Sequence, residues 1–238
     1  MKRRLAAPRS EAPFLRKSEI AAEAAVLLAE YGQQHGELTA PPVPIDNIIE
    51  LHLGLTFEVK DMRQLFQVAD VHGALWIKDR IVGVDQSLDP SLFPNKRGRY
   101  HFTLAHETGH WRLHRNHYLR CAAQGQLFEA PDKPAYVCRS GDSKKPIEWQ
   151  ADFFGANLLM PRPMVVSAWE VWRGGPRAVA LDDIRDPQVA RANGCSDEEI
   201  MEDFCRPLAE QFQVSGQAMR IRLEELELLL REKRNTLF

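Results

Sequence analysis

The stretch "HFTLAHETGHWRLH", residues 101–114, contains four histidines and one glutamate and guides the interpretation of the rest of the chain. His106 and His110 are four residues apart, which on an α-helix places them about 40° apart in rotation and one turn above each other. Two imidazoles in that position can converge on one metal ion, and Glu107 stands beside the first of them. This is the H-E-x-x-H pattern, in which the glutamate reaches a metal-bound water without being a ligand itself.

A solvated helix face whose histidines bind nothing would have the same spacing, so the prediction depends on a third ligand. Catalytic zinc takes three protein ligands and keeps one position open. The metzincin pattern needs glycine and histidine where this chain has Leu113 and Asn116, and His117 misses by one residue. His114 lies about 12 Å of helical rise from His106, too far for both to bind one ion comfortably. We expect His114 to pack or to hydrogen-bond locally.

A second segment, "EWQADFFGANLLM" at residues 148–160, offers the missing ligand. Glu148 and Asp152 are four residues apart and therefore share one helix face. Glu148 could supply the third ligand, and Asp152 could accept the outer N–H of a ligating histidine, which fixes the orientation of the ring. Alternatively, both are surface acids of an amphipathic helix. Against this, Glu148 leads into a run apolar enough to be buried against the histidine helix.

The composition is that of an ordinary soluble globular protein. The 238 residues are 44% hydrophobic and 27% charged, and the formal net charge of −2 gives no general attraction to nucleic acid or anionic membranes. No run approaches the roughly 20 apolar residues that cross a bilayer, and the basic N-terminus lacks the apolar part of a secretory signal. We therefore expect a cytoplasmic protein without membrane contact. The four cysteines form no C-x-x-C pair and are expected to be free thiols.

The order of the predicted elements indicates an α+β fold. We expect a small mixed sheet packed against the HExxH helix and the glutamate-ligand helix, followed by a helical C-terminal region over residues 166–238. A flexible tail is expected over residues 1–17. The other predicted elements are a helix from Ser18 as N-cap to Gly36, a strand over 55–62, two strands around 78–80, a loop over 88–99, a helix over 100–119, a loop over 121–146 and a polar linker over 173–197.

Two segments together, "FTLAHETGHWRLH" at 102–114 and "EWQADFFGANLLMP" at 148–161, resemble the ImmA/IrrE family of metallo-endopeptidases. That family joins an HE-x-GH helix to a later helix that opens with a glutamate ligand and closes in "LLMP". The segment "GALWIKDRIVGVDQS" at 73–87 resembles the strand pair that leads into the active-site helix. The resemblance covers roughly residues 18–165, which we predict to be a zinc metallopeptidase domain.

Carried over to this chain, the resemblance implies one Zn²⁺ ion bound by His106, His110 and Glu148. Glu107 would be the catalytic base, taking a proton from the attacking water and passing it to the leaving amine. Asp152 falls where related zinc peptidases keep an acid behind a metal ligand. Sites of two histidines and one glutamate also accept Mn²⁺ or Co²⁺, partly according to metal availability.

Two features depart from the family pattern. Many relatives have leucine where this chain has Thr108, a position that should face away from the metal. The span between the ligand helices is long because of the loop over 121–146, which could shape or cover a substrate groove. A second donor to the oxyanion is expected from a nearby histidine, tyrosine or arginine, and the candidates are His101, His117, Tyr118 and Tyr136.

The C-terminal segment "LAEQFQVSGQAMRIRLEEL", residues 208–226, has the pattern of a helix-turn-helix, with Ser215 as the N-cap of the second helix. DNA binding would require a basic face. Residues 195–238 contain six Lys and Arg but ten Asp and Glu, although Arg220 and Arg222 belong to the would-be recognition helix. Packing or docking of a partner is therefore favoured over direct DNA binding.

These observations lead us to expect a zinc-dependent endopeptidase. The resemblance implies site-specific cleavage of a helix-turn-helix repressor of the XRE (Cro/cI-like) type, in a stress response or mobile-element switch. The alternative is a non-proteolytic, zinc-containing regulator that binds DNA or a partner protein through its C-terminal helices. A basic helical face or a fourth protein ligand at the metal would favour this regulator. Glu107 argues against it, because a structural zinc site does not need that carboxylate. The sequence predicts no oligomeric state.

Overall fold

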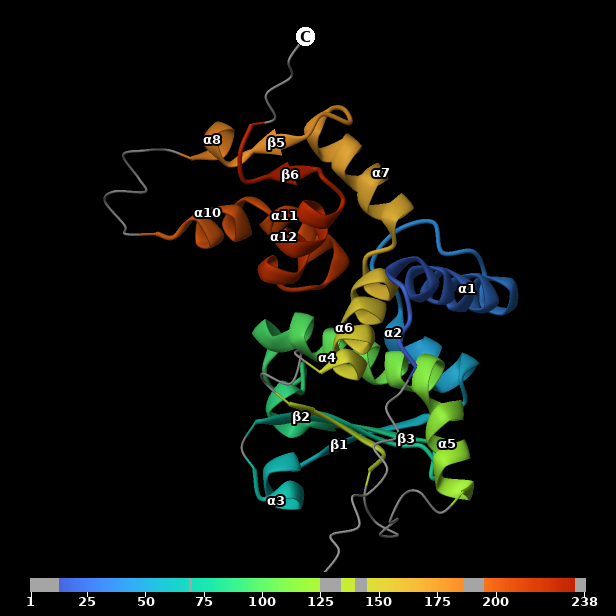
Figure 1. The fold of residues 1–238 in the computed structure, drawn as a ribbon. Helices are drawn as coiled ribbons and strands as arrows, with labels where there is room; N and C mark the ends of the chain where they lie inside the picture. The colour runs from blue at the N-terminus through green and yellow to red at the C-terminus, as the bar shows by residue number, and fades with distance from the viewer. Residues whose placement is uncertain (1–12, 69, 125–133, 140–144, 186–194, 234–238) are drawn as a thin grey trace, which may run out of the picture.

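The computed structural model has the predicted α+β fold, with a small mixed sheet covered by helices and a helical C-terminal region (Figure 1). In Figure 1 the sheet lies at the bottom, α4 and α6 lie above it, and the C-terminal elements lie at the top. The structure describes residues 13–68, 70–124, 134–139, 145–185 and 195–233. Most of the predicted tail, and parts of the predicted loop over 121–146 and of the linker over 173–197, lie outside the described residues.

The main sheet has four strands in the order β1-β3-β2-β4, so that β1 and β4 are its edges. Their bounds are β1 Thr56–Lys60, β2 Val71–Trp76, β3 Ile81–Asp85 and β4 Tyr136–Arg139. β1 pairs with β3 in parallel, whereas β2 pairs with both β3 and β4 in the antiparallel sense. The predicted turn around residues 78–80 is confirmed and includes Arg80 with φ of 58°.

Two predictions around this sheet are corrected: the first strand is confirmed with narrower bounds, and the loop over 121–146 is wrong in part. The strand expected over 55–62 ends at Lys60, because the Asp61 carboxylate accepts a hydrogen bond from the Gln64 amide and starts a short helix, α3 Met62–Phe66. The segment 121–146 is more than a loop, since its start completes a helix and β4 lies within it. Four residues are too few to show a clear period, and β4 depends on pairing with β2.

The N-terminal elements cover one side of the core. α1, Lys17–His35, buries Ile20, Ala24 and Leu27 on one face and stops at Gly36, where φ is 103°. The predicted N-cap Ser18 is wrong, because the N-cap is Arg16, two residues earlier, whose amide donates a hydrogen bond of 2.7 Å to the Glu19 carboxylate. The short α2, Ile45–Asn47, and a π-helical turn over Ile48–His52 then lead into β1.

The residues of the HExxH helix form three consecutive pieces. α4 spans Arg97–Gly109, a π-helical turn spans His110–His114, and α5 spans Arg115–Ala123. The helix therefore begins three residues earlier than predicted, within the basic cluster assigned to a loop. The glutamate-ligand helix is α6, Pro146–Leu159, and it stops before Pro161 as predicted.

Two glycines allow α4 and α6 to pack closely. A Cβ added to Gly109 would lie 3.1 Å from both the Cα and the carbonyl oxygen of Ala151, and one added to Gly155 would lie 3.3 Å from the His106 amide nitrogen. These neighbours are backbone atoms, so they cannot rotate away as the end of a side chain could. The glycine of "HETGH" therefore brings the two helices, and with them their polar side chains, to backbone contact distance.

The C-terminal region consists of short helices and a two-stranded parallel sheet, β5 with β6. The predicted helix-turn-helix shape is present as α11 and α12, and Ser215 caps α12 by accepting a hydrogen bond from the Ala218 amide. The bounds are α7 Arg162–Arg173, β5 Val179–Ala180, α8 Leu181–Ile184, α10 Asp197–Phe204, α11 Arg206–Phe212, α12 Gly216–Glu225 and β6 Leu229–Leu230.

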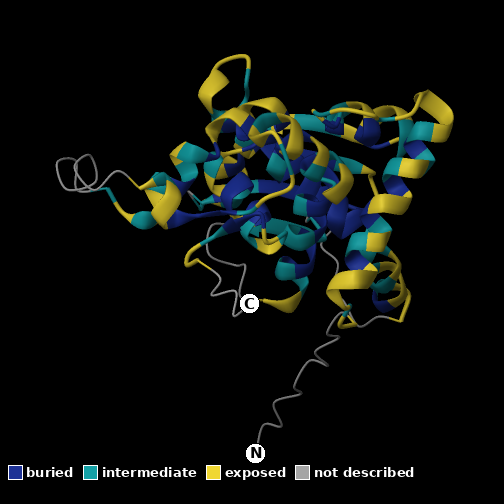
Figure 2. Ribbon diagram, turned by 90° about the horizontal axis from the view of Figure 1, so that it is seen from above, coloured by how far each residue is buried: buried dark blue, intermediate teal, exposed yellow. Residues whose placement is uncertain are grey.

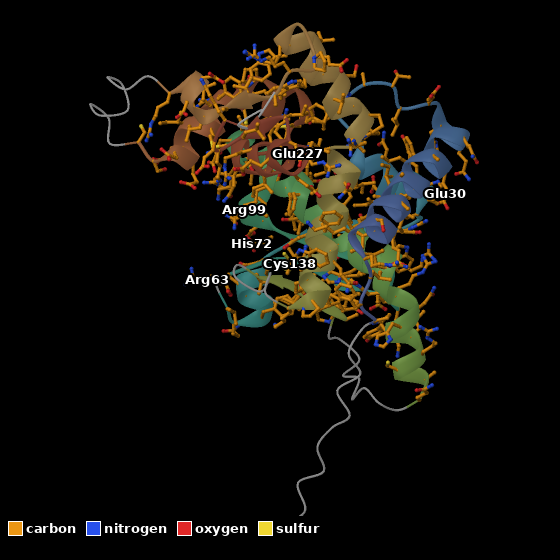
Figure 3. All side chains as sticks on the ribbon, turned by 45° about the horizontal axis from the view of Figure 1, so that its top comes forward. Glu30, Arg63, His72, Arg99, Cys138 and Glu227 are labelled. Carbon is orange, nitrogen blue, oxygen red and sulfur yellow. The ribbon has the colours of Figure 1, made fainter. Side chains whose placement is uncertain are left out.

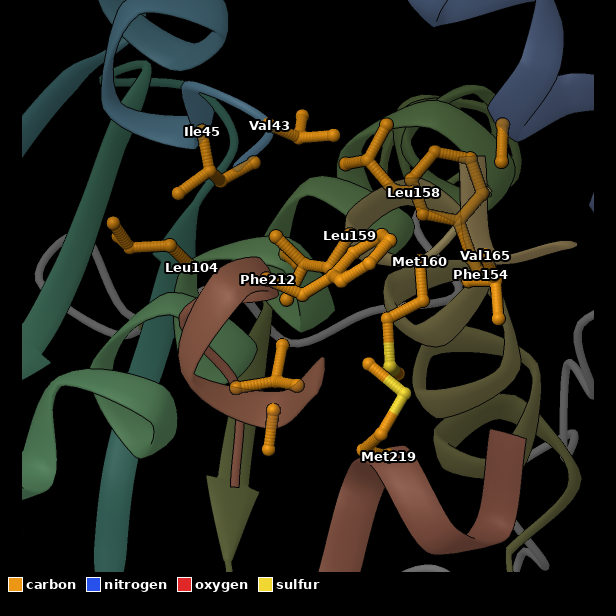
Figure 4. Packing of buried hydrophobic residues seen from close by; sticks show 14 of the residues in the cluster. Val43, Ile45, Leu104, Phe154, Leu158, Leu159, Met160, Val165, Phe212 and Met219 are labelled. Carbon is orange, nitrogen blue, oxygen red and sulfur yellow. The ribbon is translucent and has the colours of Figure 1, made fainter. Parts of the chain in front are cut away.

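The hydrophobic core runs without interruption from the sheet into the C-terminal region. Phe212 and Met219 belong to the same buried cluster as Leu159 and Met160 at the end of α6, and Figure 4 shows their side chains facing one another. Seen from above, buried residues form the centre of the molecule and exposed residues its rim (Figure 2). The C-terminal helices thus pack directly on the helix that carries Glu148.

The two arginines of the would-be recognition helix point inward. Arg222 is 3% exposed and donates hydrogen bonds to the Met160 carbonyl oxygen and the Asn157 side chain, at 3.0 and 2.9 Å. Arg220 is also buried and pairs with Glu202 and Glu224. Both guanidinium groups hold α12 in place, as the predicted packing role requires, instead of forming a basic surface.

The close contact between α4 and α6 predicts an unusual response to alanine. In a helix, Gly→Ala normally stabilises by about 1 kcal/mol. We expect Gly109→Ala instead to lower the free energy of unfolding by about 1–3 kcal/mol, because its Cβ meets the Ala151 backbone. Gly32→Ala in α1 is the control, since its Cβ would meet only one atom, at an ordinary 3.6 Å. Urea unfolding measures both, and stabilisation by Gly109→Ala would contradict the packing argument.

Candidate metal centre

Three donor atoms from α4, the π-helical turn and α6 meet at one point. His106 Nε2 lies 3.1 Å from His110 Nε2 and 3.2 Å from Glu148 Oε2, and the third distance, from His110 Nε2 to Glu148 Oε2, is 3.4 Å. A tetrahedral zinc ion with nitrogen and oxygen ligands at about 2.0–2.1 Å separates its donors by about 3.3 Å. The three predicted ligands therefore fit one tetrahedral ion.

The local sequence explains how these side chains reach one another. Each histidine is buried, and their rings lie 4.8 Å apart between centroids because they are one helical turn apart. Glu148 is in the first turn of α6, so its carboxylate is at the helix end that the Gly109 contact brings against α4. Thr108 is buried on another face, and its hydroxyl donates to the Leu104 carbonyl, consistent with the prediction that it faces away from the metal.

Asp152 lies where the sequence predicted, behind His106. Its Oδ1 is 2.8 Å from His106 Nδ1, while His106 Nε2 faces Glu148 Oε2. Both ring nitrogens thus face carboxylates, which only accept hydrogen bonds. In the metal-free chain this arrangement favours the imidazolium form of His106: burial alone lowers its pKa, but hydrogen bonds to Asp152, Cys138 and Glu148 raise it well above the ordinary value.

The neighbours of His106 respond to its charge. Burial lowers the pKa of His110 to about 3, and the nearby His106 charge adds to the effect. Burial raises the pKa of Glu148, but its contacts with His106 and His110 outweigh burial and bring the pKa to about 2. The metal-free centre therefore favours a positive charge on His106, in the place where the donor geometry fits a cation.

Glu107 is fully buried, and neither of its carboxylate oxygens has a hydrogen-bond partner among the described residues. It packs against β2, where a Cβ added to Gly73 would lie 2.7 Å from its Oε1. Burial, with a smaller contribution from the charge of Glu148, raises the pKa of Glu107 to about 8 although His106 lowers it. A buried carboxylate without a partner is costly, and such groups are found at functional sites.

The four candidates for the oxyanion donor differ in whether they lie near the three donor atoms. The Tyr136 ring stacks on His110, with centroids 4.3 Å apart and planes 6° apart, and Tyr118 lies next to Tyr136 at 6.1 Å. His101 points to the C-terminal region, where its Nδ1 is 3.1 Å from the Gln213 carbonyl oxygen. His117 contacts the Cys121 sulfur within α5. Of the four, Tyr136 contacts a metal-ligand candidate directly.

Sequence reasoning missed two residues next to the centre. Cys138, labelled in Figure 3, comes from β4, and its sulfur lies within 4.8 Å of ligand atoms of both His106 and Glu107. Gln150, fully buried on α6, contacts His114 through its side-chain oxygen at 3.1 Å. The spacing of the cysteines contained no signal for Cys138, because only the β2–β4 pairing brings it to the centre. The four cysteines form no disulfide.

Comparisons with known proteins do not identify a family. A search of protein-family models found no match to this chain, and a search of curated proteins found none either. The resemblance to ImmA/IrrE peptidases thus rests on the two motifs and remains a prediction. Among the described helices, none has the length and apolar character needed to cross a bilayer.

The proton on His106 predicts proton release on metal binding. Because a ligating nitrogen must lose its proton, we expect Zn²⁺ binding at pH 7 to release about one proton per ion. Calorimetry in buffers of different ionisation enthalpy measures this release. Asp152→Asn should reduce it, since the Asp152 hydrogen bond is the largest of those that raise the pKa of His106. A binding enthalpy independent of the buffer would contradict the assignment.

The buried Glu107 predicts that the metal-free protein loses stability as pH rises. Its folded pKa of about 8 exceeds the ordinary 4.5, so its contribution is present below pH 4.5 and is lost as pH rises through about 8. We expect Glu107→Gln to unfold near the wild-type urea concentration at pH 5 and to be more stable by about 3–5 kcal/mol at pH 8.5, both with a chelator. Glu170→Gln, at an exposed position, is the control. Equal effects of Glu107→Gln at both pH values would contradict the burial argument.

Proposed function

We propose that this protein is a zinc-dependent endopeptidase. The observation that carries the proposal is the position of a buried carboxylate without a partner, Glu107, beside three donor atoms spaced 3.1–3.4 Å apart. A purely structural metal site needs the three donors but gains nothing from an unpartnered carboxylate next to them. The alternative of a solvated helix face does not fit, because both histidines and both glutamates are buried.

Each residue has a distinct role in the proposed reaction. A bound zinc ion would lower the pKa of a water to about 7 and would polarise the peptide carbonyl. His106, His110 and Glu148 hold the ion, and Asp152 orients His106 through its Nδ1. Glu107 takes the proton of the attacking water and passes it to the leaving amine, for which a pKa near neutral is suited. Tyr136 is our candidate for the second donor to the oxyanion. Mn²⁺ would fit the same ligands.

The position of β4 supports a peptide as the substrate. β4 is an edge of the sheet, and two of its residues, Tyr136 and Cys138, lie at the metal centre. An extended peptide can add to a sheet edge through main-chain hydrogen bonds. A chain bound in this way would pass the centre with its backbone in reach of the ion and of Glu107.

The substrate class is proposed from the resemblance to ImmA/IrrE peptidases. It is a helix-turn-helix repressor of the XRE (Cro/cI-like) type, cut at one site in a stress response or mobile-element switch. Nothing in the metal centre encodes this choice, because a site that binds any peptide backbone does not select a partner by fold. Direct binding of DNA is disfavoured, since Arg220 and Arg222 are buried and paired.

One observation favours the alternative, a non-proteolytic regulator with structural zinc. The Cys138 thiol contacts His106, and a fourth protein ligand would close the metal site. Against it, the sulfur is not within 4.8 Å of the whole set of His106, His110 and Glu148 atoms. Burial also raises the pKa of this thiol, which disfavours the thiolate that zinc requires.

The test is cleavage of the repressor encoded nearest to this protein, by zinc-loaded wild type and by Glu107→Gln. The variant keeps all ligands, so we expect unchanged zinc content and a rate at least about 100-fold lower, because a positioned base contributes that much or more. Glu170→Gln should cleave like the wild type. If wild type and Glu107→Gln bind zinc and repressor equally but neither cleaves, the regulator explains the protein better.

A further inference from the structure

His110 is oriented by a chain of buried hydrogen bonds that ends at a backbone carbonyl. His110 Nδ1 lies 3.0 Å from His114 Nδ1, and His114 Nε2 lies 3.1 Å from Gln150 Oε1. The Gln150 side-chain nitrogen then donates to the Pro13 carbonyl oxygen at 3.3 Å. His110, His114 and Gln150 are all 0% exposed, so water does not replace the contacts among these three side chains, whereas Pro13 at the end of the chain is exposed.

The direction of every proton in this chain follows from its last member. A carbonyl oxygen only accepts hydrogen bonds, so the amide atom that faces Pro13 is the nitrogen of Gln150. The oxygen of Gln150 therefore faces His114 and accepts the proton on its Nε2. A neutral imidazole carries one proton, which leaves His114 Nδ1 as an acceptor. His110 Nδ1 must then donate to it, and His110 Nε2 keeps its lone pair.

This result matches what the metal centre needs. The lone pair on His110 Nε2 points to the site where His106 Nε2 and Glu148 Oε2 converge, at 3.1 and 3.4 Å. The opposite tautomer would place a hydrogen there and block binding of a metal ion. Asp152 serves His106 in the corresponding way, but with a charged carboxylate, whereas His110 is held by neutral groups only.

We propose that His114 and Gln150 are positioning residues, which fix His110 in the tautomer whose Nε2 is free to bind the metal. The π-helical turn over His110–His114 contributes, because its wider turn brings residues four apart closer to alignment than an α-helix does. The proposal rests on metal binding at the proposed centre and not on peptidase activity. The proposal also assigns a function to His114, which lies four residues after His110 and does not reach the ion.

A matched pair of variants tests the step from His114 to His110. His114→Leu removes the acceptor, and we expect the dissociation constant for Zn²⁺, measured by competition with a chelator, to rise about 10–100-fold. His114→Asn places a side-chain oxygen near the position of Nδ1 and should largely restore affinity. Gln150→Met, which removes the acceptor for His114, should weaken zinc binding in the same direction. Equal affinities of His114→Leu and His114→Asn would overturn the proposal, because a role in packing alone does not distinguish them.

A measurement on the unaltered chain covers the case in which the variants do not fold. Nitrogen-15 NMR of histidine-labelled, metal-free protein distinguishes protonated from unprotonated ring nitrogens. We expect the proton of His110 on Nδ1 and that of His114 on Nε2, and a proton on His110 Nε2 would overturn the proposal. If the wild type binds no zinc, the proposed function fails, while the tautomers still decide the role of His114 and Gln150.

Discussion

The close approach of α4 and α6 is the constraint on which the rest of the structure depends. The candidate ligands come from both helices, so their three donor atoms can converge within 3.4 Å only if the two backbones nearly touch. Gly109 and Gly155 permit that contact, and any side chain at either position would meet backbone atoms of the other helix. The sheet supports α4 from below, where Gly73 leaves room for Glu107. A separation wider by about one methyl group would remove Glu148 from the centre.

The centre collects charge at a place where the fold excludes water. Glu107 has no partner, Glu148 relies on two histidines, and His106 holds a proton between two carboxylates. Each of these arrangements costs stability in the metal-free chain, because burial disfavours charged groups. By contrast, the buried guanidinium group of Arg222 has hydrogen-bond partners in Met160, Asn157 and Glu225. Unfavourable burial is thus concentrated where a bound cation would offset the negative charge, as is usual at functional sites.

The C-terminal region shows that shape alone does not specify a function. α11 and α12 have the order and the cap of a helix-turn-helix, yet the arginines of α12 are used to fasten it to the end of α6. Phe212 and Met219 extend the same core, so this region stabilises the helix that carries Glu148. Its contribution to the candidate metal centre is to hold α6 in place.

The sequence by itself determined the features that depend on helical periodicity. The spacing of four placed His106 with His110, and Glu148 with Asp152, on common faces, because neighbours within one helix are set by its local geometry. Only the tertiary structure decided that these faces meet and that β4 brings Cys138 to them. It also decided that the hydrogen-bond chain from His110 ends at the Pro13 carbonyl oxygen. Those contacts join residues 31 to 137 positions apart, from Glu107 with Cys138 to Pro13 with Gln150. No local period encodes such pairs, because they depend on how separate elements pack.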